Sequence, residues 1–173
     1  MPCSDPNILI KVITFVRHES LSRLLSSVSS ADYGDCATID LLIEIDFSIN
    51  VDKYSRNDQD EVNRVVQQFE WPHGQKMVSH RLRNAGLRLA WLEGINGMSG
   101  IDYVAVFEDD MEVSTQFYNY IKFLHTSPYL DTDSVSAFCL CPSTVPKPPA
   151  MSSCGDSEFE NSKIFYEKQW ICR

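Results

Sequence analysis

The chain has 173 residues, 43% of them hydrophobic, which is enough for one compact domain with a sizeable core. Its net charge of -9 argues against a nucleic-acid-binding protein, because such affinity comes mainly from Lys and Arg that neutralise phosphates. No apolar stretch approaches the roughly 20 residues that span a bilayer, and the chain opens without the pattern of a signal peptide. We therefore expect one domain over residues 1–173 with no membrane segment.

Strand and helix signals alternate in the first third of the chain. The nearly continuous apolar run Ile8–Val16 predicts a strand buried on both faces. The segment Glu19–Ser30 predicts a helix, because one stripe of it carries Leu21, Leu24, Leu25 and Val28. Ile39–Asp46 repeats the strand signal and ends in an acid, and the polar residues 47–57 after it predict a loop.

Two further helices are expected before residue 94. The first begins at a cap formed by Asn57 or Asp58 and ends at WPHGQK, with a stripe of Val62, Val65, Val66 and Phe69. The second runs over Val78–Glu93 with an apolar stripe of Val78, Leu82, Ala85, Leu89 and Leu92, and a neighbouring face of Arg81, Asn84 and Arg88. GINGMSG after it predicts a turn.

The remaining sequence completes an α/β pattern. Ile101–Phe107 predicts a strand, and Ser114 is expected to cap a helix with Phe117, Tyr120, Ile121 and Leu124 on its stripe. Ser134–Leu140 predicts a last strand, and residues 142–173, which begin rich in Pro and Ser, predict an irregular tail. This order predicts a three-layer α/β sandwich with a mostly parallel sheet, whose ligands bind beyond the carboxyl ends of the strands.

Four acids stand directly after the strand Ile101–Phe107. Glu108, Asp109, Asp110 and Glu112 repel one another, and a divalent cation at this edge would relieve that repulsion. Magnesium or manganese is usually held by one or two carboxylates together with substrate phosphates, so the implied ligand is a nucleotide or another diphosphate. The alternative is a solvated acidic turn that favours the following helix through its dipole.

Several other site classes lack their motifs. The sequence has no phosphate-binding GxxxxGK[ST] loop, no HExxH and no GxSxG, and the first strand does not end in the acid of an aspartyl-phosphate enzyme. Asp131-Thr132-Asp133 precedes its strand and is interpreted as a turn. The six cysteines match neither a CxxC zinc pair nor a dense disulfide framework, and we expect free thiols with at most one disulfide; the alternative is a metal site.

Four features together resemble a known family: ITFVR on the first strand, an acid at the end of the second, WPHGQK, and FEDDMEVS before an aromatic helix. They resemble the nucleotide-sugar half of a GT-A-fold glycosyltransferase. The likeness is nearest to the N-acetylglucosaminyltransferase I type and related family 2 enzymes, and it extends over Ile8–Leu140.

The resemblance implies roles for individual residues. Asp110 would coordinate the manganese that bridges the donor phosphates, Glu108 and Asp109 would approach the ribose and the metal's waters, and Glu112 would support them or start the helix. Arg17 would meet the diphosphate and Asp46 would read the uridine, although both also suit ordinary surface positions. Of the basic group His73, Lys76, His80, Arg81 and Arg83, only Arg81 and Arg83 are kept as candidate phosphate contacts.

The predicted function is metal-dependent transfer of a sugar from a nucleotide-sugar, with UDP the expected nucleotide, to a hydroxyl of a glycan, glycoprotein or other acceptor. The resemblance implies inversion, Mn²⁺ or Mg²⁺ as cofactor and work in the Golgi lumen. It also implies a catalytic base from sequence beyond the final strand, so we expect a C-terminally truncated domain and assign no base among Asp131, Asp133, Asp156, Glu158, Glu160 and Glu167. The alternatives are a pseudoenzyme that binds nucleotide and metal without transfer, and an α/β interaction module with an acidic rim.

Overall fold

The computed structural model describes residues 5–35, 38–46, 56–84, 86–93, 99–127, 137–139 and 170–172. Its strands are β1 Ile8–Thr14, β2 Ile39–Ile45, β3 Lys76–His80, β4 Tyr103–Glu108, β5 Ala137–Cys139 and β6 Trp170–Cys172. Its helices are α1 His18–Ser29, α2 Arg56–Gln68, α3 Gly86–Leu92 and α4 Phe117–Thr126. None of the helices in these ranges is long and apolar enough to cross a membrane.

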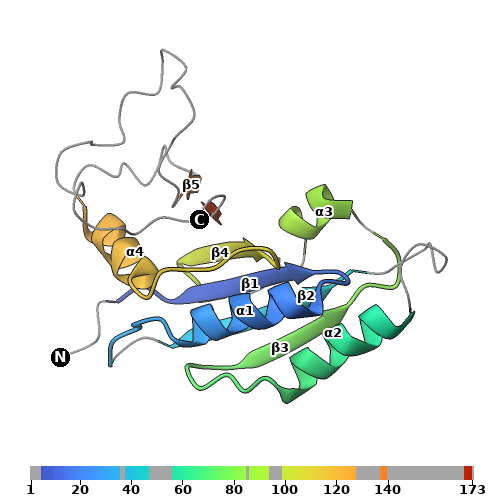
Figure 1. Ribbon diagram of the computed structural model, residues 1–173. Helices are drawn as coiled ribbons and strands as arrows, with labels where there is room; N and C mark the ends of the chain where they lie inside the picture. Colours follow the sequence, from blue (N-terminus) through green and yellow to red (C-terminus); the bar gives the residue numbers. More distant parts are fainter. Residues whose placement is uncertain are drawn as a thin grey trace, which may run out of the picture.

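The strands form one sheet in the order β3-β2-β1-β4-β6-β5 (Figure 1). β3, β2, β1 and β4 pair in parallel, whereas β6 is antiparallel to both β4 and β5. The expected α/β class and mostly parallel sheet are therefore confirmed. Because parallel strands end at one edge, β1, β2 and β4 deliver the residues that follow them to the same place.

The two faces of the sheet carry separate cores. Alternate residues of β1, beginning with Ile8, pack with α1, α2 and α4, while Leu9 and Ile13 face the other way toward α3. All four residues of the predicted α1 stripe are buried. The helices thus cover both faces, and Figure 1 shows α1 and α3 on opposite sides of the sheet. The expected three layers are present.

The predicted helix over Val78–Glu93 is confirmed only in its second half, where α3 covers Gly86–Leu92, and its first half is wrong. Residues 76–80 form β3, which pairs with the open edge of β2, and a helix begins only at Gly86. Pairing along the edge of the sheet outweighs the helical spacing of the apolar residues, and it leaves Leu82 90% exposed in the connection. Arg81 and Arg88 therefore share no helical face, because Arg81 follows β3 and Arg88 lies within α3.

The expected helix starts need correction as well. α4 begins at Phe117 with Gln116 at its cap position, and Ser114 instead accepts a hydrogen bond from the Gln116 backbone N–H at 3.1 Å. The buried stripe of α4 passes through Tyr118, whereas Tyr120 is only partly buried. α2 begins at Arg56, so the expected caps Asn57 and Asp58 lie within its first turn.

The tail is not irregular throughout, because β6 lies between β4 and β5. Three residues are too few for a periodic signal, and their strand conformation comes from pairing with the open edge of β4. β5 confirms a strand within the predicted Ser134–Leu140. The Asp131-Thr132-Asp133 turn, residues 47–55, the rest of the tail and the cysteine side chains lie outside what the structure describes.

WPHGQK lies at the amino end of β2, opposite the edge where ligands are expected. The indole of Trp71 donates to the Ile39 carbonyl at 2.6 Å, and a Cβ on Gly74 would stand 2.4 Å from that same oxygen. Lys76 donates to the carbonyls of Val66 and Phe69 at the end of α2. These contacts give the motif a structural role in positioning β2.

Candidate functional site

The acidic segment after β4 is held against the ends of its neighbouring strands. Glu108 pairs with Ile13 of β1, and the Asp109 backbone N–H donates to the Ile13 carbonyl at 3.1 Å. On the other side of β1, the Asp46 N–H donates to the Thr14 carbonyl at 2.9 Å. The ends of β1, β2 and β4 therefore bring Asp46, Arg17 and the acids to one edge.

Asp109 faces the protein interior. Its side chain is 2% exposed, and its Oδ2 accepts hydrogen bonds from the Thr14 hydroxyl at 2.9 Å and the Phe15 N–H at 3.3 Å. Its Oδ1 pairs with the Arg17 guanidinium. Two hydrogen bonds to Oδ2 and an ion pair to Oδ1, all from the end of β1 and the loop after it, thus hold this buried carboxylate and the β4 loop in place, although Oδ1 has no hydrogen bond of its own.

Asp110 faces outward and shares Arg17 with Asp109. Its Oδ2 lies 3.0 Å from Nη1 of Arg17, and the two side chains are 49% and 52% exposed. Burial opposes the charge on Arg17, but the attraction of Asp109 and then Asp110 outweighs it and raises the pKa of Arg17. Asp110 therefore offers carboxylate oxygens to solvent beside a permanent cation.

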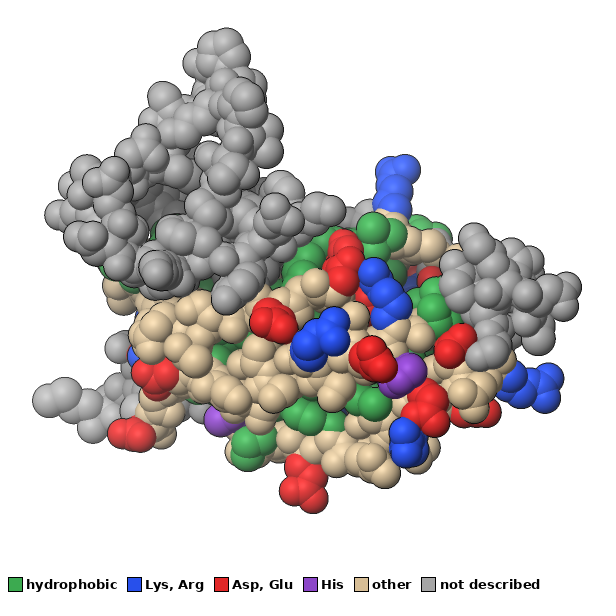
Figure 2. Space-filling model, viewed as in Figure 1, with side chains coloured by type: hydrophobic (Ala, Val, Ile, Leu, Met, Phe, Trp, Pro, Cys, Tyr) green, Lys and Arg blue, Asp and Glu red, His purple; other side chains and the backbone are tan. Residues whose placement is uncertain are grey.

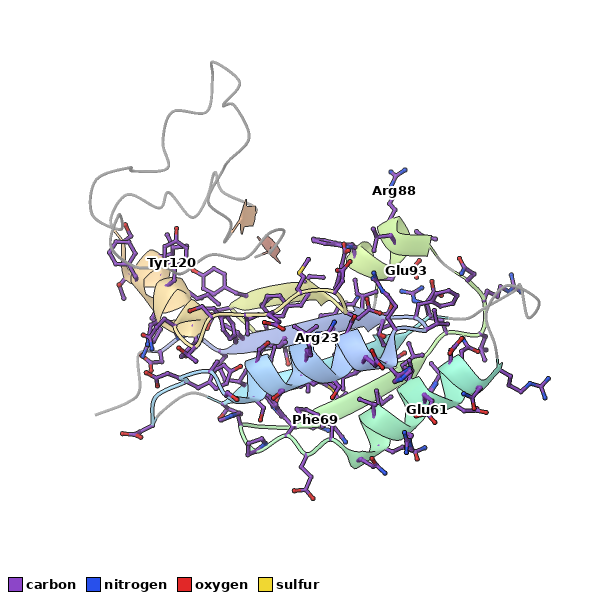
Figure 3. The ribbon with its side chains drawn as sticks, in the orientation of Figure 1. Arg23, Glu61, Phe69, Arg88, Glu93 and Tyr120 are labelled. Carbon is purple, nitrogen blue, oxygen red and sulfur yellow. The ribbon has the colours of Figure 1, made fainter. Side chains whose placement is uncertain are left out.

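Buried and exposed residues alternate in the loop after Asp110. Met111 and Val113 are buried, and the Val113 N–H donates to the Ser27 hydroxyl of α1 at 3.1 Å. Glu112 between them is exposed, and one of its oxygens lies 3.8 Å from Nε of Arg23. Figure 3 shows Arg23 on α1, and on the face seen in Figure 2 basic side chains lie among acidic ones.

We predict that the protein loses stability when the buried Asp109 loses a hydrogen-bond donor. Thr14→Val keeps the shape of the side chain but removes the hydroxyl that donates to Asp109, so the free energy of unfolding should fall by about 1–3 kcal/mol. Urea unfolding measures this loss. Thr115→Val, at an exposed position of the same loop, is the control and should change stability by less than about 0.5 kcal/mol. Equal stability of the Thr14 and Thr115 variants would contradict the assignment.

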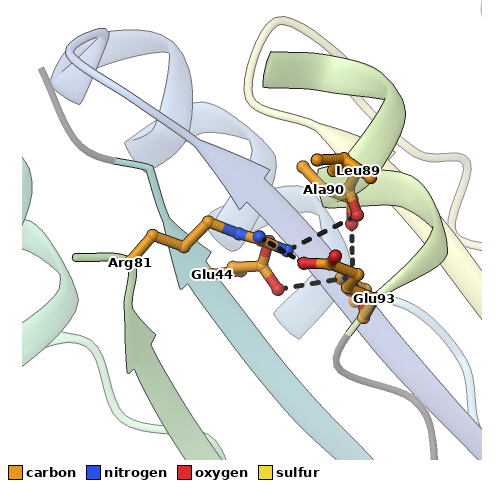
Figure 4. Close-up of polar contacts among 6 residues, drawn as sticks. Glu44, Arg81, Leu89, Ala90 and Glu93 are labelled. Carbon is orange, nitrogen blue, oxygen red and sulfur yellow. Dashed lines mark hydrogen bonds and ion pairs between the residues drawn. The ribbon is translucent and has the colours of Figure 1, made fainter. Parts of the chain in front are cut away.

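A charge network with a buried ion pair lies on the α3 face of the sheet (Figure 4). Lys11 is 0% exposed and its Nζ lies 3.4 Å from Oε2 of Glu44, which is 3% exposed. Arg81 pairs with Glu44 at 2.5 Å and with Glu93 at 2.7 Å. Burial lowers the pKa of Lys11, and the attraction of Glu44 opposes this shift only in part.

The sequence contained a signal for this network that our sequence analysis missed. Lys11 and Glu44 are charged residues within strands that are otherwise mostly apolar, and they carry opposite charges. Parallel pairing of Lys11 with Leu42 and of Ile13 with Glu44 places the two charges on one face, two residues apart. Isolated charges are too costly to bury, so two opposite ones in neighbouring buried strands indicate an ion pair.

Not all the predicted site residues come together. Arg17, Asp109 and Asp110 are in direct contact, Glu108 adjoins them on β4, and Asp46 follows the neighbouring strand β2. Arg81 lies in the charge network on the α3 face, and Arg83 is exposed in the connection after β3. Arg81 thus has ion-pair partners of its own, Glu44 and Glu93, and its role as a phosphate contact stays a prediction.

An open depression of about 300 Å³ borders Arg17. Its lining comes from the start of α1 and from the first turn of α2: Val16, Arg17, His18, Glu19, Ser20 and Asp58. Arg17, at the cap position of α1, makes no side-chain hydrogen bond to the first turn, and the N-terminus of a helix favours an anion, although Glu19 in this turn is itself acidic. The depression, Arg17 and Asp110 are therefore contiguous features of the carboxyl edge.

A divalent cation fits this edge only together with a ligand. Among the described residues, no three His, Cys, Asp or Glu side chains gather into a metal cage. Asp110 supplies exposed, hard carboxylate oxygens, which suit Mn²⁺ or Mg²⁺ when phosphate oxygens complete the coordination. The residues present are thus compatible with a metal-diphosphate complex.

Comparison with known proteins places the fold. No protein-family model and no curated protein matches the chain. Among solved structures, the chain is similar to the mannosyltransferase PcManGT from Pyrobaculum calidifontis, in complex with GDP-Man and Mn²⁺, at 16% identity and a TM-score of 0.58. The match covers 82% of this chain and 37% of that one.

A second similar structure is S. aureus TarS 1-349 in complex with UDP-GlcNAc, with 12% identity and a TM-score of 0.51. The match covers 84% of this chain and 38% of that one. The chain has a GT-A-type glycosyltransferase fold. It spans less than half the length of each of these two structures, and the specific likeness to the N-acetylglucosaminyltransferase I type stays a prediction.

Proposed function

We propose that this protein is a metal-dependent, inverting glycosyltransferase that uses a UDP-sugar, and that the described residues form its donor site. The observation that carries the proposal is the contact of Arg17 with both Asp109 and Asp110 at the carboxyl edge of a GT-A-type fold. At this edge the guanidinium of Arg17 lies beside the solvent-exposed carboxylate of Asp110. A diphosphate with its divalent cation presents the complementary pair of charges.

Each residue of the edge then has a distinct task. Asp110 would hold Mn²⁺ or Mg²⁺, which when bound neutralises the charge of the leaving diphosphate. Arg17 and the N-terminus of α1 would bind phosphate oxygens at the rim of the depression. Asp109, which is already bonded to β1, would position the loop instead of touching the donor.

The choice of UDP depends on Asp46, because its position after β2 suits contact with the base. The two similar structures hold GDP-Man and UDP-GlcNAc, so the fold alone does not select a nucleotide. The acceptor we propose is a hydroxyl of a glycan or glycoprotein. We assign no catalytic base.

The proposal predicts a metal-dependent thermal shift. UDP with Mn²⁺ should stabilise the native chain, by about 2.7 kcal/mol at a hundredfold excess over Kd, whereas UDP or Mn²⁺ alone should do far less. Asp110→Asn should abolish the combined effect, because it removes the ligand carboxylate. Differential scanning fluorimetry measures both, with GDP as the parallel nucleotide.

The matched control is Glu112→Gln, which neutralises an exposed acid of the same loop that pairs with Arg23. It should retain the shift. No metal-dependent stabilisation of the native chain would remove the proposed site. Stabilisation without hydrolysis or transfer of a UDP-sugar would instead favour a protein that binds the nucleotide and metal only.

A further inference from the structure

We propose that Trp91 is a positioning residue of the donor site, and that its indole N–H orients the carboxylate of Glu108 toward the hydroxyls of the donor ribose. The indole Nε1 lies 3.2 Å from Oε1 of Glu108. The inference rests on the proposed function, because it takes Glu108 to meet the donor.

Both apolar and polar contacts hold α3 in place. The helix has 7 residues, and its Leu87 and Leu89 are exposed. Ala90 is buried and Trp91 packs partly against the core on this face. Charged groups at the carboxyl end of α3 add to this apolar contact and help to set the orientation of the helix.

The charged side chains of Lys11 and Arg81 hydrogen-bond to backbone carbonyls on both sides of Trp91. Lys11 donates to the carbonyls of Ala90 and Glu93, where the negative end of the helix dipole favours a cation. Arg81 donates to the Glu93 carboxylate at 2.7 Å and contacts the Leu89 carbonyl at 3.5 Å. Figure 4 shows Arg81 and Glu93 directed toward each other. The backbone at Trp91 is thus tied to both β1 and the end of β3.

The alternation of β4 brings Glu108 to the same place. Val104 and Val106 face α3, and Glu108 continues this face at the end of the strand. Asp109, the next residue, is held by Thr14 of β1. The first acid of the triplet is therefore oriented by α3 and the second by β1.

An oriented carboxylate suits recognition of neighbouring hydroxyls. An ionised carboxylate only accepts hydrogen bonds, and the ribose of a nucleotide supplies two hydroxyl donors. The indole N–H fixes one carboxylate oxygen and with it the plane of the group. Loss of the indole should therefore weaken ribose recognition more than it weakens the fold.

Trp91→Phe tests this, because it removes the N–H and keeps an aromatic ring. In calorimetric titrations with UDP at saturating Mn²⁺, we expect Kd to rise about threefold to tenfold, less than for loss of a direct charged contact. The variant should also bind 2′-deoxy-UDP or 3′-deoxy-UDP nearly as well as UDP, whereas the native chain should discriminate. In the double variant with Glu108→Gln, the two losses should not add.

Trp71→Phe is the matched control, since its indole donates to the Ile39 carbonyl at the opposite edge. It should bind UDP as the native chain does. If Trp91→Phe binds UDP and the deoxy nucleotides as Trp71→Phe does, the positioning role is overturned.

A ligand-free measurement separates this inference from the proposed function. In ¹H–¹⁵N spectra of the native chain, Glu108→Ala should shift the indole resonance of Trp91 and leave that of Trp71 unchanged. An unmoved Trp91 resonance would overturn the hydrogen bond itself. If the native chain binds no UDP with Mn²⁺ yet the resonance shifts, the proposed function fails and the contact is shown to serve only the fold, which also overturns the positioning role.

Discussion

Glu44→Gln is expected to lower the free energy of unfolding by about 3–5 kcal/mol, the usual cost when one partner of a buried ion pair is removed. Glu44 forms an ion pair with Lys11, and the neutral amide would leave the fully buried ammonium without that counter-charge, although backbone carbonyls still accept its hydrogen bonds. Arg81 would lose a partner as well, although its contact with Glu93 would remain. Chemical denaturation monitored by circular dichroism measures the change.

The double variant Lys11→Met with Glu44→Gln is the informative comparison. Removing both charges also removes the uncompensated one, so this variant should be more stable than Glu44→Gln alone. Glu61→Gln is the control, because it breaks a surface pair with Arg64 and should cost less than about 1 kcal/mol. A loss for Glu44→Gln no larger than that of the control would contradict a buried network.

Arg17→Met is expected to change two affinities in opposite directions. The arginine competes with a cation for Asp110, so its removal should tighten binding of Mn²⁺ alone by about twofold to fivefold, the size of an exposed ion pair. The same change should weaken binding of UDP in saturating Mn²⁺ by about tenfold or more, because charge-assisted hydrogen bonds to the diphosphate are lost. Calorimetry with Mn²⁺ alone and with UDP plus Mn²⁺ measures both.

Two controls distinguish this effect from a general loss of charge. Arg23→Met removes an arginine within α1 that is paired with Glu112, and it should alter neither affinity beyond about twofold. Arg17→Lys keeps the competing charge without the two-pronged geometry, so it should leave Mn²⁺ binding near the native value and restore UDP binding in part. If Arg17→Met weakened both ligands, the arginine would be acting only through its support of the buried Asp109.

Local sequence patterns were sufficient to predict the strands and helices whose own apolar residues mark a buried run or stripe. The apolar runs of β1, β2 and β4 predicted the parallel core of the sheet, and the leucine stripe predicted α1. The same order of elements predicted which edge collects Arg17, Asp46 and the acids. The likeness of FEDDMEVS to known glycosyltransferases then suggested the chemistry, and the GT-A-type fold agrees with it.

Elements whose conformation depends on a distant partner were not predictable in this way. The helical spacing of residues 78–93 predicted a helix that starts too early, because residues 76–80 pair with β2 as strand β3 and the helix begins only at Gly86. β6 is equally dependent on β4, from which it is separated by more than 60 residues. Short strands at an open edge carry too little pattern of their own to predict their pairing.

The sequence by itself therefore determined the strand and helix core, the edge that holds the candidate site and the presence of four acids there. Only the tertiary structure decided which acid faces inward: Asp109 is enclosed by Thr14 and Arg17, whereas Asp110 is open to solvent. It also decided that Arg81 serves a buried network and that Trp91 reaches Glu108. The reason is physical, because a carboxylate's exposure and partners depend on neighbouring strands and helices that its own sequence neighbours do not specify.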